Sequence, residues 1–158
     1  MDCITIKQVK EFMGKLLMKE DFDKYLLQEA EIVTCNIFRI DGHVQKAFYS
    51  NEEYEELGKP VLTKWENIRP FCYDIIKGHK TPVRFKIVLR LSDEETIAFM
   101  EETQNVLSIQ DVGGLYLNLV YEKDVLNCIT GTYLNIFTMD KSLEKAWDKK
   151  IQKEIMNL

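Results

Sequence analysis

The sequence predicts an α+β fold, with helices packed on one face of a mainly antiparallel sheet of about five strands. Two observations indicate this class. Segments with strand and helix periodicity are mixed along the chain, and the two clearest strand pairs are joined by short turns, which makes them antiparallel. The 158 residues, 46% of them apolar, suffice for one hydrophobic core, and no linker composition divides the chain. We therefore expect residues 1–158 to form a single domain.

Four of the expected helices are recognised by their first residues. A hydroxyl side chain followed three residues later by Glu or Gln can form a capping box, which satisfies two backbone N–H groups at a helix start. This pattern predicts helix starts at Thr5 with Gln8, Ser50 with Glu53, Thr63 with Glu66, and Ser92 with Glu95. The third helix is expected to end at Gly78 and contains Pro70, which we expect to interrupt or restart it because proline removes a helical hydrogen bond.

A fifth helix is expected to begin near Asp140 or Ser142 and to continue toward the C-terminus. Its apolar residues recur every four positions, so they lie one turn apart on a single helix face. They are Leu143, Trp147, Ile151 and Ile155. Such a stripe is suited to packing against a sheet.

The first expected hairpin surrounds the dipeptide Asp41-Gly42. Segments 31–40 and 43–49 on either side have strand character, and Asp-Gly is favoured in two-residue type I′ turns. We therefore predict that the chain reverses at this dipeptide.

The second expected hairpin lies near the C-terminus. Segment 115–121 alternates apolar and polar residues and is expected to turn at 122–124 into a long strand, 125–139. Gly131 inside that strand predicts a bulge or a bend, and Gly113-Gly114 before the hairpin predicts a hinge. Segment 81–91 is expected to be a single strand between two helices.

Composition excludes several protein classes. The net charge of −5 argues against a general DNA-coating role, the start of the chain lacks the features of a signal peptide, and no apolar run reaches the roughly 20 residues of a membrane span. The four cysteines have no metal-ligand spacing, so we expect them to be reduced and metal-free rather than held in disulfides or a zinc site assembled at long range. A cytoplasmic location is expected.

The clearest functional signal is a basic stretch in this acidic chain. Residues 69–90 contain six basic residues and one acid, Asp74. The candidate binding residues are these six cations and the histidine among them: Arg69, Lys77, His79, Lys80, Arg84, Lys86 and Arg90. Clustered charge can steer an oppositely charged partner even when the whole protein has the other sign.

Within the predicted strand, Arg84, Lys86 and Arg90 occupy alternate positions and therefore share one face. Side chains on one face of a strand repeat every 6.6 Å or so, roughly the spacing of phosphates along a nucleic-acid strand. If they form a binding face, they should be exposed together and lack nearby carboxylates. The competing explanation is a solvated polar face with salt bridges to the acid-rich remainder of the chain. The pattern of this strand, taken by itself, favours the competing explanation.

Signals for catalysis are weak. The sequence lacks a nucleophile elbow, a phosphate loop, a dinucleotide-binding glycine pattern and a metalloprotease motif. His43, two residues after Asp41, and His79 are the only histidines, and each is expected to be a surface turn residue.

Several runs of residues carry a resemblance to a known family. They are 69–72, 76–82, 85–88, 130–132, 136–144 and 147–148, which read RPFC, IKGHKTP, FKIV, TGT, IFTMDKSLE and WD. Over nearly the whole chain they resemble a small family of uncharacterised proteins, with a domain of unknown function, from anaerobic gut bacteria. The resemblance implies a bacterial cytoplasmic protein, and it supplies no activity and no catalytic residue.

Three functional hypotheses follow. The first is a non-enzymatic binding protein that uses the seven candidate residues to contact an anionic macromolecule or an acidic protein surface. The alternative is a small enzyme whose site is assembled from dispersed carboxylates and a histidine. The third is a homo-oligomer that buries the outer face of the sheet. No cofactor, metal or membrane association is expected.

Overall fold

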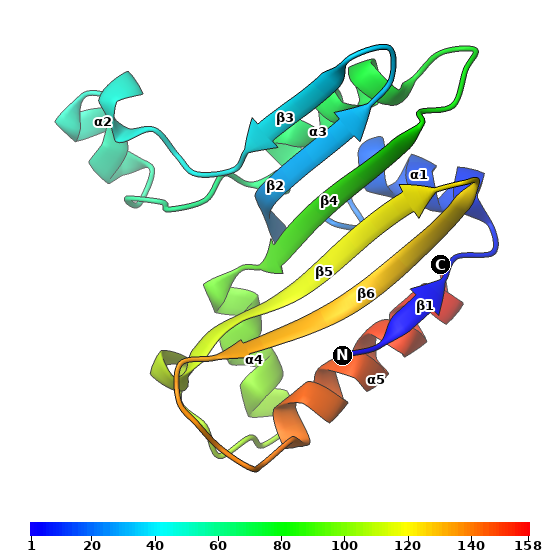
Figure 1. The fold of residues 1–158 in the computed structure, drawn as a ribbon. Coiled ribbons are helices and arrows are strands. Elements are labelled where there is room, and N and C mark those ends of the chain that lie inside the picture. The colour runs from blue at the N-terminus through cyan, green and yellow to red at the C-terminus, as the bar shows by residue number, and fades with distance from the viewer.

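The structure, a computed structural model, describes residues 1–158 and is built on one six-stranded antiparallel sheet (Figure 1). The strand order is β1-β6-β5-β4-β2-β3. The strands are β1 Cys3–Thr5, β2 Tyr25–Val33, β3 Ile37–Asp41, β4 Arg84–Leu91, β5 Val112–Glu122 and β6 Val125–Leu134. The predicted α+β class is confirmed, with six strands in place of about five.

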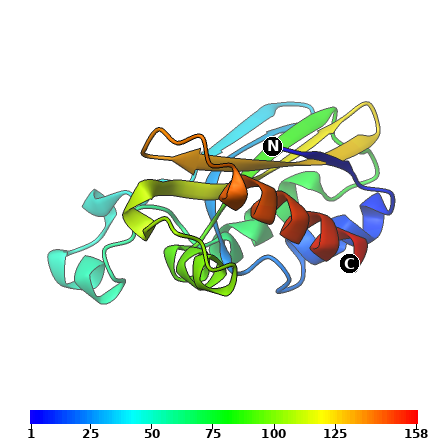
Figure 2. The same cartoon turned by 90° about the horizontal axis from the view of Figure 1, so that it is seen from below.

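Helices cover only one face of this sheet. The five α-helices are α1 Val9–Leu17, α2 Asn51–Glu56, α3 Trp65–Ile76, α4 Asp93–Glu102 and α5 Ser142–Met156, and two short 3₁₀ helices are η1 Lys46–Phe48 and η2 Ile109–Asp111. Figure 2 shows α1, α3, α4 and α5 on one side of the sheet, while α2 stands apart on an arm that follows β3. The opposite face of the sheet, called here the open face, carries no helix.

The hydrophobic core lies between the sheet and the four covering helices. Strand residues of alternating position point into it, as Phe85, Ile87 and Leu89 of β4 show by their burial. Trp147 of α5 is fully buried and its indole N–H donates to the carbonyl of Tyr116 at 3.1 Å. The predicted stripe of α5 is therefore confirmed, with its last member, Ile155, packed at the margin of the core.

Two of the four predicted capping sites are confirmed. Ser50 forms a complete capping box with Glu53, and the hydroxyl of Ser92 accepts from the backbone N–H three residues on. The prediction for the first helix is wrong, because Thr5 ends a strand that pairs with β6. The third helix also lacks a hydroxyl cap.

The expected interruption at Pro70 is wrong as well, since α3 runs without a break from Trp65 to Ile76. A proline there deprives only the carbonyl of Glu66 of its usual partner, and the rest of the helix keeps its ladder.

The first hairpin turn lies seven residues before the predicted one. β2 and β3 are joined at residues 34–36, and the chain passes through Gly42 in an extended form. Gly42 is needed for a close approach, because a Cβ atom there would lie 1.8 Å from the carbonyl oxygen of Leu27. Thr63 fills the gap beyond, where its N–H donates to Gly42 and its carbonyl accepts from Leu27. At Asp41-Gly42 the chain therefore does not reverse. It passes close to the backbones of Leu27 and Thr63 instead, and this close approach is called here the crossing at Gly42.

The second hairpin is confirmed in position, with β5 and β6 joined at Lys123 and Asp124, both at positive φ. The second strand ends at Leu134, earlier than predicted, because the chain leaves the sheet toward α5. The bulge is not at Gly131. The register instead shifts between Val112 and Gly114, so the predicted hinge glycines form the irregular start of β5.

Candidate functional site

The open face of the sheet is the candidate site because the basic residues of β4 lie on it. Strand alternation places Arg84, Lys86, Val88 and Arg90 of β4 on this face, opposite the buried residues of the same strand. The register aligns one row across all six strands: Arg39, Glu31, Lys86, Val120, Asn127 and Thr5. In this row the residues of β3, β2 and β4 are charged, and the residues of β5, β6 and β1 are neutral or apolar. The half of the open face formed by β3, β2 and β4 is called here the charged half.

Each of the three strand cations has a carboxylate partner. The nitrogen-to-oxygen distances are 3.5 Å for Arg84 with Glu31, 3.6 Å for Lys86 with Glu29, and 3.2 Å for Arg90 with Asp93. The three cations do share one face, as predicted, but the expectation that they lack nearby carboxylates is not met. For Arg84 and Lys86 the reason is the antiparallel register, which lays the acidic positions of β2 beside the basic positions of β4. Arg90 instead meets Asp93, three residues on, in the first turn of α4. Salt bridges of this kind are what the competing explanation, a solvated polar face, predicts.

Arg90 differs from the other two because its side chain is mostly buried. Its Nη2 atom donates to the carbonyl of Gly113 at 3.0 Å, and its Nε atom is buried without a partner. A Cβ atom at Gly114 would lie 2.6 Å from this Nε atom. Arg90 therefore packs into the irregular start of β5 and supports the sheet there.

The remaining candidate residues lie elsewhere. Arg69 is on α3, on the helix-covered side, where its guanidinium makes two hydrogen bonds of 3.1 and 3.3 Å to the carboxylate of Asp23. Lys77 pairs with Asp74 at 3.1 Å. His79 and Lys80 are exposed in the loop before β4 and form no ion pair. Only part of the predicted basic patch is therefore assembled by the fold.

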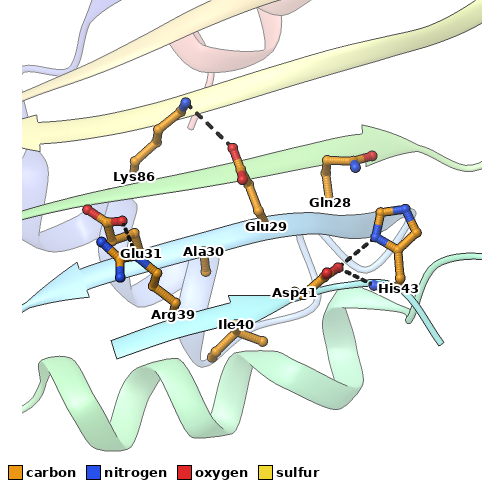
Figure 3. Close-up of a pocket in the computed structure, with 9 residues that line it drawn as sticks. All are labelled: Gln28, Glu29, Ala30, Glu31, Arg39, Ile40, Asp41, His43 and Lys86. Atoms are coloured by element: carbon orange, nitrogen blue, oxygen red, sulfur yellow. Dashed lines mark hydrogen bonds and ion pairs between the residues drawn. The ribbon is translucent and has the colours of Figure 1, made fainter. Parts of the chain in front are cut away.

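A shallow hollow of about 570 Å³ lies on the charged half of the open face (Figure 3). It contains His43, which the sequence predicted to be a surface turn residue, paired with Asp41. The ring nitrogen Nδ1 of His43 lies 2.6 Å from Oδ1 of Asp41, and the backbone N–H of His43 donates to the same oxygen at 2.9 Å. The signal that could have found this pair is the spacing of two residues, since an Asp carboxylate commonly accepts from the backbone N–H two positions on.

Two carboxylates of the hollow, those of Asp41 and Glu31, have a lowered pKa. The backbone N–H of His43, and then its ring, keep the pKa of Asp41 below its ordinary value. The guanidinium of Arg39, which bonds Glu31 at 2.8 Å, lowers the pKa of Glu31, with a smaller contribution from Arg84. The hollow is thus a set of charge pairs rather than a basic surface.

Residues 15–157 match a family model described as a family of unknown function, DUF5721. The chain belongs to the DUF5721 family. No curated protein and no solved structure matches it. The match spans every candidate site residue and the hollow, so the site lies within the part of the chain that defines a DUF5721 protein. The family-level resemblance inferred from the sequence is confirmed, and the origin in gut anaerobes stays a prediction.

The chemistry available to this DUF5721 protein is narrow. No three His, Cys, Asp or Glu side chains are arranged to hold a metal ion. The carboxylate of Asp41 can orient His43, as in base–orienter pairs, and no hydroxyl or thiol lines the hollow as a nucleophile. No helix has both the length and the apolar character required to cross a bilayer. The hollow thus presents cations and carboxylates side by side, with one histidine held by a carboxylate.

Proposed function

We propose that this is a non-enzymatic binding protein whose contact surface is the charged half of the open face. The observation that carries the proposal is a sheet face with no helix over it, on which Arg84 and Lys86 stand two residues apart. The proposed partner is an acidic segment of another protein.

The existing ion pairs leave these cations available. Arg84 and Lys86 are 46% and 53% exposed, and each contacts its carboxylate at no less than 3.5 Å. Exposed ion pairs of this kind contribute at most about 1 kcal/mol. A partner that brings its own carboxylates can therefore replace Glu29 and Glu31 with little loss of free energy.

The interleaved acids favour a peptide over a nucleic acid. Glu29, Glu31 and Glu122 lie among the cations on the same face, and they would repel a continuous phosphate backbone. An acidic peptide can space its carboxylates to meet the cations alone. The anionic macromolecule of the first hypothesis is narrowed here to a protein, and the cytoplasmic location stays a prediction.

The test is fluorescence anisotropy with a labelled peptide of alternating Glu and Ser, at low and moderate salt. We expect binding to the wild type, loss in Arg84→Gln/Lys86→Gln, and tighter binding to Glu29→Gln/Glu31→Gln, in which the cations have lost their internal partners. The control is Lys145→Gln/Lys149→Gln, which removes two exposed cations from α5.

Equal binding by all four proteins would contradict the proposal. Tighter binding of a single-stranded oligonucleotide than of the peptide would assign the face to nucleic acid instead.

A second candidate function, a small enzyme, rests on the His43 and Asp41 pair at the edge of the hollow. Chromogenic carboxylic and phosphate esters are suitable probes. Hydrolysis by the wild type that is lost in His43→Gln and kept in His79→Gln would support this function.

A further inference from the structure

Strand β3 forms a free edge of the sheet. The opposite edge, β1, has only three residues, whereas β3 has five in unbroken register with β2. The strand contains no proline and no bulge, and its residues on the helix side, Phe38 and Ile40, are apolar. Of the usual devices that prevent an edge strand from pairing with another chain, β3 therefore lacks proline and a bulge, and the two charges that it carries, Arg39 and Asp41, are of opposite sign.

The hydrogen-bond pattern shows which backbone groups of β3 face outward. The N–H of Thr34 donates to Asn36, and the N–H of Gly42 donates to Gln28. Because antiparallel ladders bond at every second residue, the even-numbered residues of 36–42 face β2. The groups that point away from the sheet belong to Ile37, Arg39 and Asp41.

The free edge ends at His43. Its N–H donates to the Asp41 carboxylate, and its carbonyl accepts from the side chain of Gln45 at 3.3 Å. Three residues of backbone are therefore left to bond a partner strand.

We propose that β3 pairs antiparallel with β3 of a second copy of this chain, with Arg39 opposite Asp41 of that copy. The two side chains have opposite charge, lie two residues apart and share the open face. An antiparallel partner meets each of them with its complement, so the contact is made twice. The two sheets would join into one of twelve strands.

Charge selects this register from the symmetric alternatives. Pairing Arg39 with Arg39 of the second copy would place like charges directly opposite, which destabilises a strand pair. Pairing Arg39 with Ile37 would leave the charges unmatched. The proposed register also sets Ile40 against Ile40 of the second copy on the helix side.

The atoms needed for the contact are unused within one chain. Arg39 bonds Glu31 through Nε only, which leaves both terminal nitrogens, and its side chain is 72% exposed. Both hydrogen bonds to Asp41 use Oδ1, which leaves Oδ2, and its side chain is 73% exposed. The pairing requires neither the acidic partner of the proposed function nor the surface of β4.

The first test is sedimentation velocity of the wild-type chain from about 1 µM to about 500 µM, since mass action favours a dimer at high concentration. We expect the mass to rise from 18.6 kDa to twice that value. Hydrogen exchange at the amides of Arg39 and Asp41 should slow over the same range. A mass of one chain at every concentration would overturn the proposal.

Charge reversal tests the register. Arg39→Asp and Asp41→Arg should each be monomeric alone, because like charges then face each other. Mixed in equal amounts they should form a dimer, since every opposed pair becomes complementary. In the register that pairs Arg39 with Arg39, position 41 lies opposite Ile37, so Asp41→Arg would not change any pair of facing charges. A dimer of Asp41→Arg alone would therefore overturn the proposed register.

The matched control is Arg84→Asp, which removes the same kind of contact to Glu31 from a strand that is not at the edge. It should dimerise as the wild type does. Circular dichroism establishes that each variant is folded, and a folded Arg39→Asp that dimerises normally would overturn the proposal. A wild-type protein that dimerises but does not bind the acidic peptide would contradict only the proposed function.

Discussion

At the scale of single residues, the hydroxyl group of Tyr25 stands out because it is buried without a hydrogen-bond partner. Burial raises the pKa of Tyr25 well above its ordinary value, and the nearby carboxylate of Glu154 adds to the effect. A buried polar group without a partner costs about 1–3 kcal/mol of desolvation.

We predict that Tyr25→Phe stabilises the protein by about 1 kcal/mol, because it removes this desolvation cost and keeps the ring. Urea unfolding measures the change. The control is Tyr121→Phe, whose hydroxyl donates to Asp124 at 3.2 Å and whose loss should destabilise by about 0.5–1.5 kcal/mol. Destabilisation by Tyr25→Phe would show that the hydroxyl has a partner in solution.

The cysteines fall into two classes. Cys3 and Cys35 are exposed, and Cys72 and Cys128 are buried, where burial raises the pKa of each thiol to about 12. Since the thiolate is the reactive form, we predict two fast thiols in the native protein and four after unfolding, counted with a chromogenic disulfide without reductant. Two thiols after unfolding would indicate a disulfide and overturn the reduced assignment.

At the scale of elements, α5 is attached mainly by its stripe of apolar residues. Trp147 lies fully buried at its centre, 5.7 Å from the ring of Phe99 between centroids. We predict that Trp147→Ala lowers the free energy of unfolding by about 3–5 kcal/mol, the range for a buried large aromatic residue.

Phe137→Ala is the control for α5, because this ring is 91% exposed and its loss should change stability by less than about 0.5 kcal/mol. Similar effects of the two substitutions would show that α5 does not dock through Trp147.

The crossing of β2, β3 and segment 61–64 depends on Gly42. A methyl group there would meet the backbone of Leu27, which cannot move without separating the strands. We predict that Gly42→Ala destabilises the protein by at least about 3 kcal/mol in urea unfolding, at the upper end for overpacking.

The control is Gly14→Ala in α1, where no atom lies within 4 Å of the added methyl group. It should stabilise the helix by about 0.5–1 kcal/mol, because alanine loses less backbone entropy than glycine. A Gly42→Ala protein as stable as the wild type would show that the crossing is looser than described.

At the scale of the whole molecule, the buried thiols link stability to alkaline pH. The unfolded chain releases the protons of Cys72 and Cys128 near pH 9.0, whereas the native chain holds them to about pH 12. Between these values the unfolded state binds fewer protons, so the free energy of unfolding falls as pH rises.

We therefore predict lower urea midpoints at pH 10 than at pH 8, measured with reductant present. Cys72→Ala/Cys128→Ala should have a weaker dependence on pH over this range. If the urea midpoints of the double variant and the wild type depend equally on pH, other titrating groups cause the dependence.

Two surfaces organise the molecule as a whole. The open face presents charge pairs to a proposed acidic partner, and the β3 edge presents backbone groups to a proposed second copy. They meet at the hollow, where Asp41 and Arg39 belong to both. A dimer would therefore bring two open faces side by side in one continuous sheet.

The sequence by itself determined the features that depend on near neighbours. The stripe of α5, the capping box at Ser50 and the hairpin at Lys123-Asp124 involve residues at most a few positions apart, so their side chains meet once the local backbone forms. These features, together with their order along the chain, were enough for the α+β class.

Only the tertiary structure decided the charge pairs, the crossing at Gly42 and the free edge. Arg84 meets Glu31 across 53 positions of sequence, and the distance between them is set by the register of β2 on β4. A basic strand looks the same in sequence whether or not a carboxylate lies beside it. Register follows from the burial of one sheet face, which involves every strand at once, and for that reason the assembled site could not be predicted from local patterns.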